Sequence, residues 1–347
     1  MALFGEKKKV SIGIDIGTSS IKIVELTSFD KGKIALTNYG EYDGGIGSAL
    51  DSSSIKLSAQ EASDIIKQIM SEARIVGTEA AMSVPIFSGF STTIYMPNMP
   101  DAEFEQAVIY EAKKYIPLPL SEVQFEWVRI NNGSKDRTGK AEILIVAVTN
   151  ELINKYNNIA NLSGLALKYL EIDIFSLARS LLSLEDEQAL IVDIGSQTTI
   201  LSIVSGSWPV FTRSIDISGA GFSRLLSSSL GVDLLRAEEM KKESGVNVGD
   251  GILLPLLDSI FVEGKRIVNE YSGHNGSKRE LNKVIISGGS ARMPGLLDYA
   301  KKFFGEKVLI GFPFHDIIYP KVLEPVLKEI ASKFDVAVGL ALRDFRQ

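Results

Sequence analysis

The sequence predicts an α/β protein built from two similar lobes. The main observation is a repeat, because residues 10–26, VSIGIDIGTSSIKIVEL, resemble residues 189–204, ALIVDIGSQTTILSIV. In both, an apolar run ends in Asp-Ile-Gly, a polar turn follows and a second apolar run leads away, which is the pattern of a β-hairpin. The second observation is length, because 347 residues exceed what one hydrophobic core usually supports. Two lobes, each containing one such hairpin, are therefore expected.

The two polar turns carry residue types that suit phosphate and a cation. Gly17 and Gly195 lack the side chain that would keep a ligand's oxygens away from the backbone. Neighbouring hydroxyl groups and turn N–H groups can cradle phosphate. Asp15 and Asp193 stand at strand ends, where they can hold Mg²⁺ through water. The other residues predicted to bind phosphate are Thr18, Ser19 and Ser20 in the first turn and Ser196, Gln197 and Thr198 in the second.

The bulk composition narrows the class of protein. Hydrophobic residues make up 45% of the chain and charged residues 23%, which is ordinary for a soluble globular protein. A net charge of −6 without a large basic block argues against a nucleic-acid partner. The chain has no cysteine, which excludes disulfides and thiolate metal sites and favours a cytosolic location. No apolar run reaches the roughly 18–20 residues that cross a bilayer. The start, MALFGEKKK, lacks the apolar region of a secretory signal.

Residues 1–79 are expected to begin the first lobe. After the first hairpin comes a strand at 33–42. An amphipathic helix follows at 58–73, where Ser58 and Glu61 have the spacing of a capping box.

Residues 80–149 break this pattern and are expected to form a small α+β subdomain inserted in the first lobe. Short apolar strands surround one Pro-bounded helix, in a ββαββ-like order. The expected strands are 80–85, 90–97, 122–130 and 141–149, with the helix between the second and the third.

The remaining residues alternate between strand and helix patterns again. Residues 150–185 are expected to return to the first lobe, residues 186–317 to form the second lobe, and residues 318–347 to complete the first. Within the second lobe, residues 218–276 have a mostly helical pattern and are expected to form a subdomain.

With these motifs in order, the chain resembles the actin-like ATPases, whose ribonuclease H-like fold places two similar lobes around a nucleotide cleft. A single Asp-x-Gly is often an ordinary β-turn, whereas five landmarks in the superfamily's order over nearly the whole chain are specific. They are two phosphate motifs, two connecting motifs and one adenosine motif. In chain order the landmarks are Asp15–Lys22, Glu171–Arg179, Asp193–Thr198, Ile285–Pro294 and Val336–Leu342.

The resemblance implies ATP and Mg²⁺ as cofactors and adds residues to the site. In the superfamily a Gly-Gly turn, here Gly288-Gly289, packs on adenine, and a helix with the pattern of Glu238 and Lys241 binds ribose and flanks the base. Lys22 stands where many relatives place a lysine on the β-phosphate. From the residues alone, the turn could be a plain strand-to-helix turn, the helix a solvated face and Lys22 an outward strand residue. The residues that the resemblance adds for ATP are Lys22, Gly219, Glu238, Lys241, Lys242, Gly288, Gly289, Ser290 and Arg292.

Asp173 is the candidate catalytic residue. The segment 170–179, LEIDIFSLAR, resembles the first connecting motif, in which the acid of a Glu-Pro pair orients the attacking water in active relatives. Here the pair is Asp173-Ile174, and Asp is one methylene shorter than Glu. The resemblance therefore implies ATP binding with slow or no hydrolysis, and a helix N-cap role for Asp173 is the alternative.

Within the superfamily, the inserted block resembles that of the PilM family of type IV pilus assembly proteins. The segment 96–127 is similar to that family's Pro-bounded turn, acidic helix and aromatic strand, and residues 115–119, YIPLP, are the most specific part. FtsA division proteins usually continue into an amphipathic membrane helix, whereas this sequence ends at Gln347 directly after the second connecting motif.

The PilM resemblance implies a cytoplasmic ATP-binding adaptor at the cytoplasmic face of the inner membrane. Members bind the N-terminal peptide of the bitopic membrane protein PilN in a groove between the first lobe's core and the inserted subdomain, which is peptide recognition on an apolar surface. Other pilus motor or platform components are further expected partners, and membrane association is expected only through partners. An FtsA-like division scaffold and, less favoured, a small-molecule kinase are the alternatives.

Overall fold

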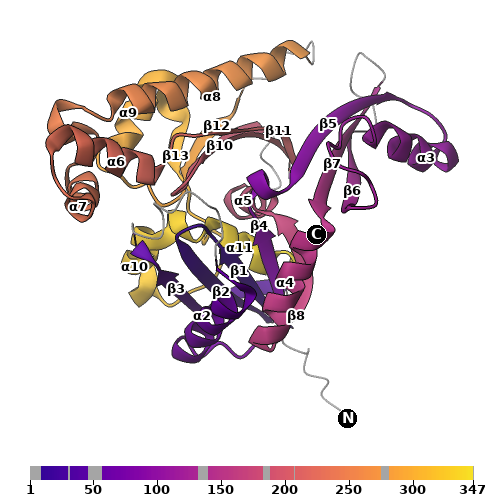
Figure 1. The fold of residues 1–347 in the computed structure, drawn as a ribbon, viewed down its shortest axis with the longest axis horizontal. Coiled ribbons are helices and arrows are strands. Elements are labelled where there is room, and N and C mark those ends of the chain that lie inside the picture. Colours follow the sequence, from indigo (N-terminus) through magenta and orange to yellow (C-terminus); the bar gives the residue numbers. More distant parts are fainter. Residues whose placement is uncertain are drawn as a thin grey trace.

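The computed structural model describes residues 9–29, 32–45, 57–131, 140–182, 188–206, 208–274 and 281–346. They form two lobes, each built on a five-stranded mixed sheet, and a smaller body with a three-stranded sheet (Figure 1). The start of the sequence, which we expect not to be a secretory signal, lies outside these ranges.

The sheet of the first lobe contains the first predicted hairpin. Its strands are β1 (Lys9–Ile16), β2 (Ser20–Phe29), β3 (Lys33–Asp43), β4 (Glu79–Val84) and β8 (Ala166–Ile172). The spatial order is β3-β2-β1-β4-β8. β1, β2 and β3 are antiparallel neighbours, whereas β4 and β8 join in parallel on the other side of β1.

Helices cover both faces of this sheet. They are α2 (Ala59–Glu72), α4 (Asn150–Ser163), α10 (Glu324–Ile330) and α11 (Asp335–Leu342), whereas α5 (Asp173–Leu181) packs against the sheet of the second lobe. The isoleucines of β1 pack against α2 and α4 on one face, while α11 covers the other. The predicted capping box is confirmed, because the Ser58 hydroxyl accepts from the Glu61 N–H at 3.2 Å and the Glu61 carboxylate accepts from the Ser58 N–H at 2.7 Å.

The inserted subdomain has its own small core. Its elements are β5 (Phe90–Pro97), α3 (Asp101–Ala112), β6 (Val123–Asn131) and β7 (Lys140–Thr149). The strands form an antiparallel sheet of order β5-β7-β6, on which α3 buries Phe104, Val108 and Ala112. The subdomain also contacts the second lobe, because the Thr93 hydroxyl donates to the Val210 carbonyl at 3.0 Å.

The expectation that residues 80–85 belong to the inserted block is wrong. That strand is β4, and it lies between β1 and β8 in the sheet of the first lobe. It is buried along its length after Glu79, as a central parallel strand must be. The ββαββ-like order is therefore βαββ, and the polypeptide leaves the core through a short 3-10 helix, Ile86–Ser88.

The second lobe repeats the sheet of the first. Its strands are β9 (Gln188–Ile194), β10 (Thr199–Ser205), β11 (Trp208–Ile215), β12 (Lys283–Ser287) and β13 (Val308–Ile310). The order β11-β10-β9-β12-β13 matches that of the first lobe position by position, and β9 and β10 form the second predicted hairpin. Its helices are α6 (Gly219–Leu230), α7 (Leu234–Ser244), α8 (Leu254–His274) and α9 (Leu296–Phe304).

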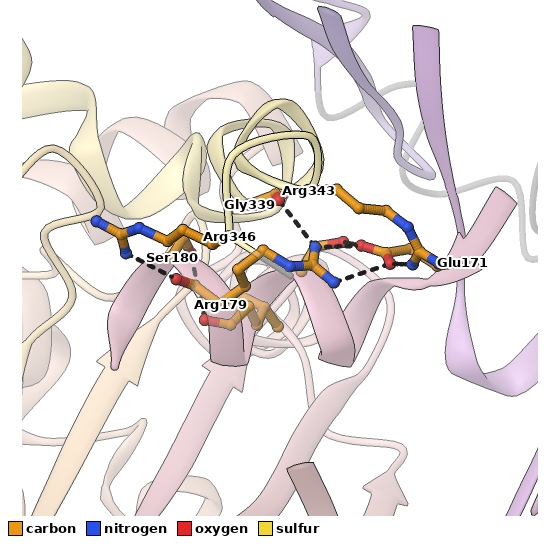
Figure 2. Close-up of polar contacts among 8 residues, drawn as sticks. Glu171, Arg179, Ser180, Gly339, Arg343 and Arg346 are labelled. Atoms are coloured by element: carbon orange, nitrogen blue, oxygen red, sulfur yellow. Dashed lines mark hydrogen bonds and ion pairs between the residues drawn. The ribbon is translucent and has the colours of Figure 1, made fainter. Parts of the chain in front are cut away.

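The helices α5 and α11 cross each other between the lobes. A Cβ atom on Gly339 of α11 would lie 1.9 Å from the Ser176 carbonyl oxygen of α5, so only glycine permits this approach. Beside the crossing, Arg179 donates to both carboxylate oxygens of Glu171, at 2.6 and 3.0 Å, and to the Gly339 carbonyl at 2.9 Å (Figure 2). Arg343 also bonds Glu171, so one buried carboxylate joins β8, α5 and the end of α11.

Across the described ranges, no single helix combines the length and the apolar composition needed to cross a membrane. The one pair that reaches them together, residues 234–250 with 254–272, is bent by 97°.

Candidate functional site

One cleft between the lobes collects nearly all of the residues predicted to bind ATP. Both turns line it, together with the start of α6, one side of α7, the Gly288-Gly289 turn and the first residues of α5 and α11. Arg292 is the exception, because its side chain is exposed and does not line the cleft. The predicted residues that do line it are Asp15, Gly17, Thr18, Ser19, Ser20, Lys22, Asp173, Asp193, Gly195, Ser196, Gln197, Thr198, Gly219, Glu238, Lys241, Lys242, Gly288, Gly289 and Ser290.

The two repeated turns have the same backbone geometry and face each other. The Gly17 N–H donates to the Ser20 carbonyl at 2.9 Å, and the Gly195 N–H donates to the Thr198 carbonyl at 3.0 Å. The hydroxyl groups of Thr18 and Ser196 are 2.6 Å apart, so the turns meet across the cleft. The arrangement leaves backbone N–H groups and hydroxyls of both lobes along one opening, as a phosphate chain would require.

In the first lobe, the charge of Asp15 is compensated by its neighbours. Ser83 of β4 donates a hydrogen bond to the Asp15 carboxylate at 2.9 Å. Lys22 lies directly opposite Asp15 in the hairpin register, with its ammonium 3.7 Å from the carboxylate, and donates to the Ser20 hydroxyl at 2.6 Å. Because Lys22 is buried and lines the cleft, the alternative of an outward strand residue is wrong.

In the second lobe, Asp193 is packed under the Gly-Gly turn. Gly288 has φ +90°, and a Cβ atom on it would lie 2.5 Å from the Asp193 carboxylate and from the Ile194 carbonyl oxygen. The Gly288 N–H donates to the Ser332 carbonyl at 2.9 Å. Burial and the charge of Asp15 raise the pKa of Asp193 to about 6, while the nearby Ser287 hydroxyl and the charge of Lys22 act to lower it. The backbone of this turn therefore packs closely against Asp193 and Ile194 and leaves no room for a side chain at position 288, unlike a plain strand-to-helix turn.

The side of the cleft that the resemblance assigns to adenosine is built from α6 and α7. Lys241 is buried, and its ammonium donates to the Gly219 carbonyl at 3.0 Å and to Glu238 at 2.6 Å. Ser223 donates to the same Glu238 carboxylate at 2.5 Å, and the Lys242 ammonium lies 3.4 Å from it. The face of α7 that carries Glu238 and Lys241 is therefore oriented by partners rather than freely solvated.

Asp173 begins α5 at the floor of the cleft. The N-cap position belongs to Ile172, so the alternative N-cap role of Asp173 is not supported. Burial, followed by the charges of Asp193 and Asp15, raises the pKa of Asp173 well above its ordinary value, against backbone hydrogen bonds from Ile174 and Ile86. Its Oδ1 atom is buried and, within the described part of the chain, has no hydrogen-bond partner.

Asp335 is a cleft residue that the sequence analysis missed. It begins α11, is 1% exposed, and accepts a hydrogen bond from Ser287 at 2.5 Å. Its Oδ1 atom, like that of Asp173, is buried without a partner among the described residues. The available signal is an acid directly before the apolar second connecting motif, because Asp335 precedes Val336, where that motif is predicted to begin.

The donor set of the cleft suits a hydrated cation. No three His, Asp or Glu side chains among the residues with described positions gather closely enough to ligate a metal ion directly. Asp15, Asp173, Asp193 and Asp335 nevertheless line one cleft, and two of their oxygens lack partners. Mg²⁺ prefers oxygen donors and usually keeps several of its waters. These side chains therefore fit Mg²⁺ held through water better than Mg²⁺ held directly.

The fold and these motifs agree with a comparison of the chain with known families. The family described as "Type IV pilus assembly protein PilM" matches residues 13–345. The chain belongs to the PilM family. The resemblance that the sequence suggested through residues 96–127 is therefore confirmed over nearly the whole chain.

Solved structures place this PilM-family chain in the predicted fold class. The structure titled "PilM-PilN type IV pilus biogenesis complex" is 25% identical, covers 97% of this chain and 99% of that chain, and gives a TM-score of 0.81. The ethanolamine utilization protein EutJ from Carboxydothermus hydrogenoformans is 15% identical, covers 96% of this chain and 89% of that chain, and gives 0.57. A MamK double helical filament is 13% identical, covers 97% and 99%, and gives 0.52. The actin-like fold is confirmed.

Proposed function

We propose that this PilM-family protein is an ATP-binding adaptor of type IV pilus assembly, in which the nucleotide sets the angle between the lobes. The observation that carries the proposal is the pair of repeated turns that meet across one cleft, with the Thr18 and Ser196 hydroxyls 2.6 Å apart. A ligand with several phosphates would contact both turns at once and would therefore bind the lobe arrangement that fits it best.

Each part of ATP has residues suited to it. The phosphates would lie along the N–H groups of the two turns and the start of α6, where the helix dipole also favours negative charge. The ribose would meet Glu238, and adenine would pack on the Gly288-Gly289 turn beside Lys241. Mg²⁺ would be held through water by Asp15 and Asp193, and would supply positive charge that neutralises the phosphates.

We expect ATP turnover to be slow or absent. A residue that orients an attacking water must accept a proton or a hydrogen bond in its charged form. The raised pKa of Asp173 favours its neutral form, and its carboxyl is already engaged by the N–H groups of Ile174 and Ile86. ATP binding would then act as a conformational signal rather than as a source of chemical work.

The proposed partner is the N-terminal peptide of a PilN-like bitopic membrane protein, at the cytoplasmic face of the inner membrane. The solved relative with the TM-score of 0.81 is a PilM-PilN complex. The peptide would bind within the inserted subdomain and at its border with the first lobe. Val108 and Ala112 are fully buried in the subdomain core, so they are not available to a partner. Tyr110, Tyr115 and Leu118 are exposed at 67%, 46% and 41%.

Calorimetric titration tests the nucleotide part of the proposal. Wild-type protein should bind ATP in the presence of Mg²⁺. Asp193→Ala should abolish measurable binding because it removes the carboxylate that packs under the Gly288-Gly289 turn. Asp216→Ala, an exposed position on the polypeptide after β11, is the matched control and should bind as the wild type does. Unchanged affinity in Asp193→Ala would overturn the site assignment.

A separate binding experiment tests the partner. A peptide from the N-terminus of a PilN-like protein should bind the full chain, while the C-terminal tail of a tubulin-like division protein should not. Binding of the division tail alone would favour the FtsA-like alternative, which the family match already disfavours.

A further inference from the structure

The internal repeat extends beyond the two turns. β4 and β12 occupy the same place in their sheets, beside β1 and β9. Ser287 of β12 lies opposite Asp193 in the register, and Ser83 of β4 follows the pair Ile14–Met82, which places it level with Asp15. Each lobe therefore sets a serine beside the aspartate that ends its central strand.

Each half of the sequence repeat also supplies a second aspartate from a connecting helix. Asp173 is the first residue of α5, and Asp335 is the first residue of α11. Both line the cleft, and in the part of the chain that the structure describes both have a buried Oδ1 atom without a hydrogen-bond partner. The cleft thus holds two sets of Asp, Ser and Asp, one from each half of the repeat.

The two sets use their serines differently. Ser83 donates to Asp15, the strand aspartate, at 2.9 Å, whereas Ser287 donates to Asp335, the helix aspartate, at 2.5 Å. A hydroxyl group has one proton to donate. Ser287 is also within hydrogen-bonding reach of Asp193. Asp335 and Asp193 therefore compete for one donor, and in this structure Asp335 has it.

The residues paired with Asp15 and Asp193 across their hairpins also differ in charge. Asp15 faces Lys22, whose ammonium is 3.7 Å away, while the residue opposite Asp193 is Ile200. Among the described residues, Asp193 takes part in no ion pair. Of the two strand aspartates, Asp15 is therefore the one with an ion-pair partner among the described residues, although the charge of Lys22 also lowers the pKa of Asp193.

We propose that Asp335 is a positioning residue of this cleft, which engages the Ser287 hydroxyl and thereby leaves the Asp193 carboxylate free for the hydration shell of the cation that accompanies the nucleotide. This inference rests on the proposed nucleotide function. Two backbone features hold Asp335 in place. It starts the helix α11, and three residues earlier the Ser332 carbonyl accepts a hydrogen bond from the Gly288 N–H at 2.9 Å.

The test measures how strongly Mg²⁺ improves nucleotide binding, as the ratio of the ATP Kd in EDTA to the ATP Kd in Mg²⁺. In Asp335→Ala the freed Ser287 hydroxyl turns to Asp193 and occupies it, so the ratio should fall about tenfold, the usual worth of one hydrogen bond to a charged group. Asp335→Asn keeps an oxygen acceptor for Ser287 and should restore the ratio to within about twofold of the wild type.

The double variant Asp335→Ala with Ser287→Ala separates positioning from general damage. It lacks the hydroxyl that would occupy Asp193, so its ratio should return toward the wild-type value although it carries more substitutions. A double variant as low as Asp335→Ala, or an Asp335→Asn as low as Asp335→Ala, would overturn the proposal. Thermal unfolding without ligand establishes that each variant is folded.

Two further outcomes distinguish a failure of this inference from a failure of the proposed function. Wild-type protein that binds no ATP in either condition contradicts the proposed function, whereas wild-type binding with an unchanged ratio in Asp335→Ala contradicts only the role of Asp335. Should Asp335→Ala not fold, Ser287→Ala alone is decisive. Its ratio should match the wild type because the Ser287 hydroxyl already donates to Asp335 rather than to Asp193, and a large fall would refute the assignment.

Discussion

The two halves of the cleft share their backbone and differ in their charges. In the first lobe, Asp15 accepts from Ser83 and faces Lys22. In the second, the corresponding Asp193 faces Ile200, and the neighbouring serine is engaged elsewhere. The strand order and the turn hydrogen bond are the same in both. The two halves thus share one turn geometry, while the residues across from their strand aspartates differ in charge, Lys22 in the first and Ile200 in the second.

The largest expected effect comes from Glu171, a buried acid at the junction of the lobes that has no acidic counterpart at the end of β13. Glu171 is buried between Arg179 and Arg343, whereas β13 of the second lobe ends in Ile310. Glu171→Ala leaves two guanidinium groups without their carboxylate and should lower the free energy of unfolding by about 3–5 kcal/mol. Glu324→Ala breaks an exposed pair with Lys328 and should change it by less than about 1 kcal/mol. Denaturant unfolding measures both.

A second prediction concerns the residue after the repeated serine, which is Val84 in the first lobe and Gly288 in the second. Gly288→Ala should lower the free energy of unfolding by about 2–3 kcal/mol, because the positive φ and the contacts 2.5 Å from its Cβ position leave no room. Gly289→Ala is the matched control, since no atom lies within 4 Å of its Cβ position. Equal stability of the two variants would show that the turn is not fitted to Asp193.

A third prediction compares the two strand aspartates directly. Asp193→Asn removes the strand carboxylate that has no ion-pair partner among the described residues and should reduce the improvement of ATP binding by Mg²⁺ about tenfold more than Asp15→Asn does. The reason is that Asp15 already accepts from Ser83 and lies near Lys22. Calorimetry in EDTA and in Mg²⁺ measures both variants. Equal losses would mean that the two halves share the cation evenly.

The smallest expected effect is the pH dependence of nucleotide binding. The pKa of Asp193 is raised from 3.8 to about 6, so near pH 5.5 most of this carboxyl is protonated while folded. Mg²⁺ and its waters require the ionised form, so ATP affinity should fall about fourfold between pH 7.5 and pH 5.5. Binding at pH 6 should also release protons, which titrations in two buffers of different ionisation enthalpy detect. Both effects should disappear in Asp193→Asn.

The same shift has the opposite consequence for the stability of the free protein. The folded state binds more protons than the unfolded state between about pH 4 and pH 6, so this group's contribution favours folding at low pH and is lost as pH rises through 6. Asp193→Asn should therefore reduce that slope in the free energy of unfolding.

The sequence predicts most where the signal is local. The repeated hairpins, the capping box at Ser58 and Glu61, and the glycines of the turns depend on neighbours along the chain, and the structure has them. The assignment of the strand at 80–85 to the inserted subdomain is wrong, because a strand that is apolar on both faces has the same sequence pattern in any sheet.

The missed residues depend on contacts between distant segments. Asp335 enters the cleft only because α11 packs between β1 and α5, and its serine partner is 48 positions away. The resemblance alone implies Arg292 as an ATP-binding residue, but its side chain is exposed and does not line the cleft. The resemblance predicts that Lys22 faces the cleft, and it does, whereas alternation along β2 alone is compatible with either face of the sheet.

The packing of α11 has a consequence for how the protein is made. Its helix lies against β1, where a Cβ atom on Gly13 would be 2.0 Å from the Ala337 carbonyl oxygen, and it fills the first lobe's second core. A ribosome delivers residues 335–342 only after the entire second lobe has emerged. The N-terminal lobe therefore waits, with one face of its sheet incompletely covered, until the C-terminal lobe has been synthesised, and a nascent chain completes the cleft between its lobes as one of its last steps.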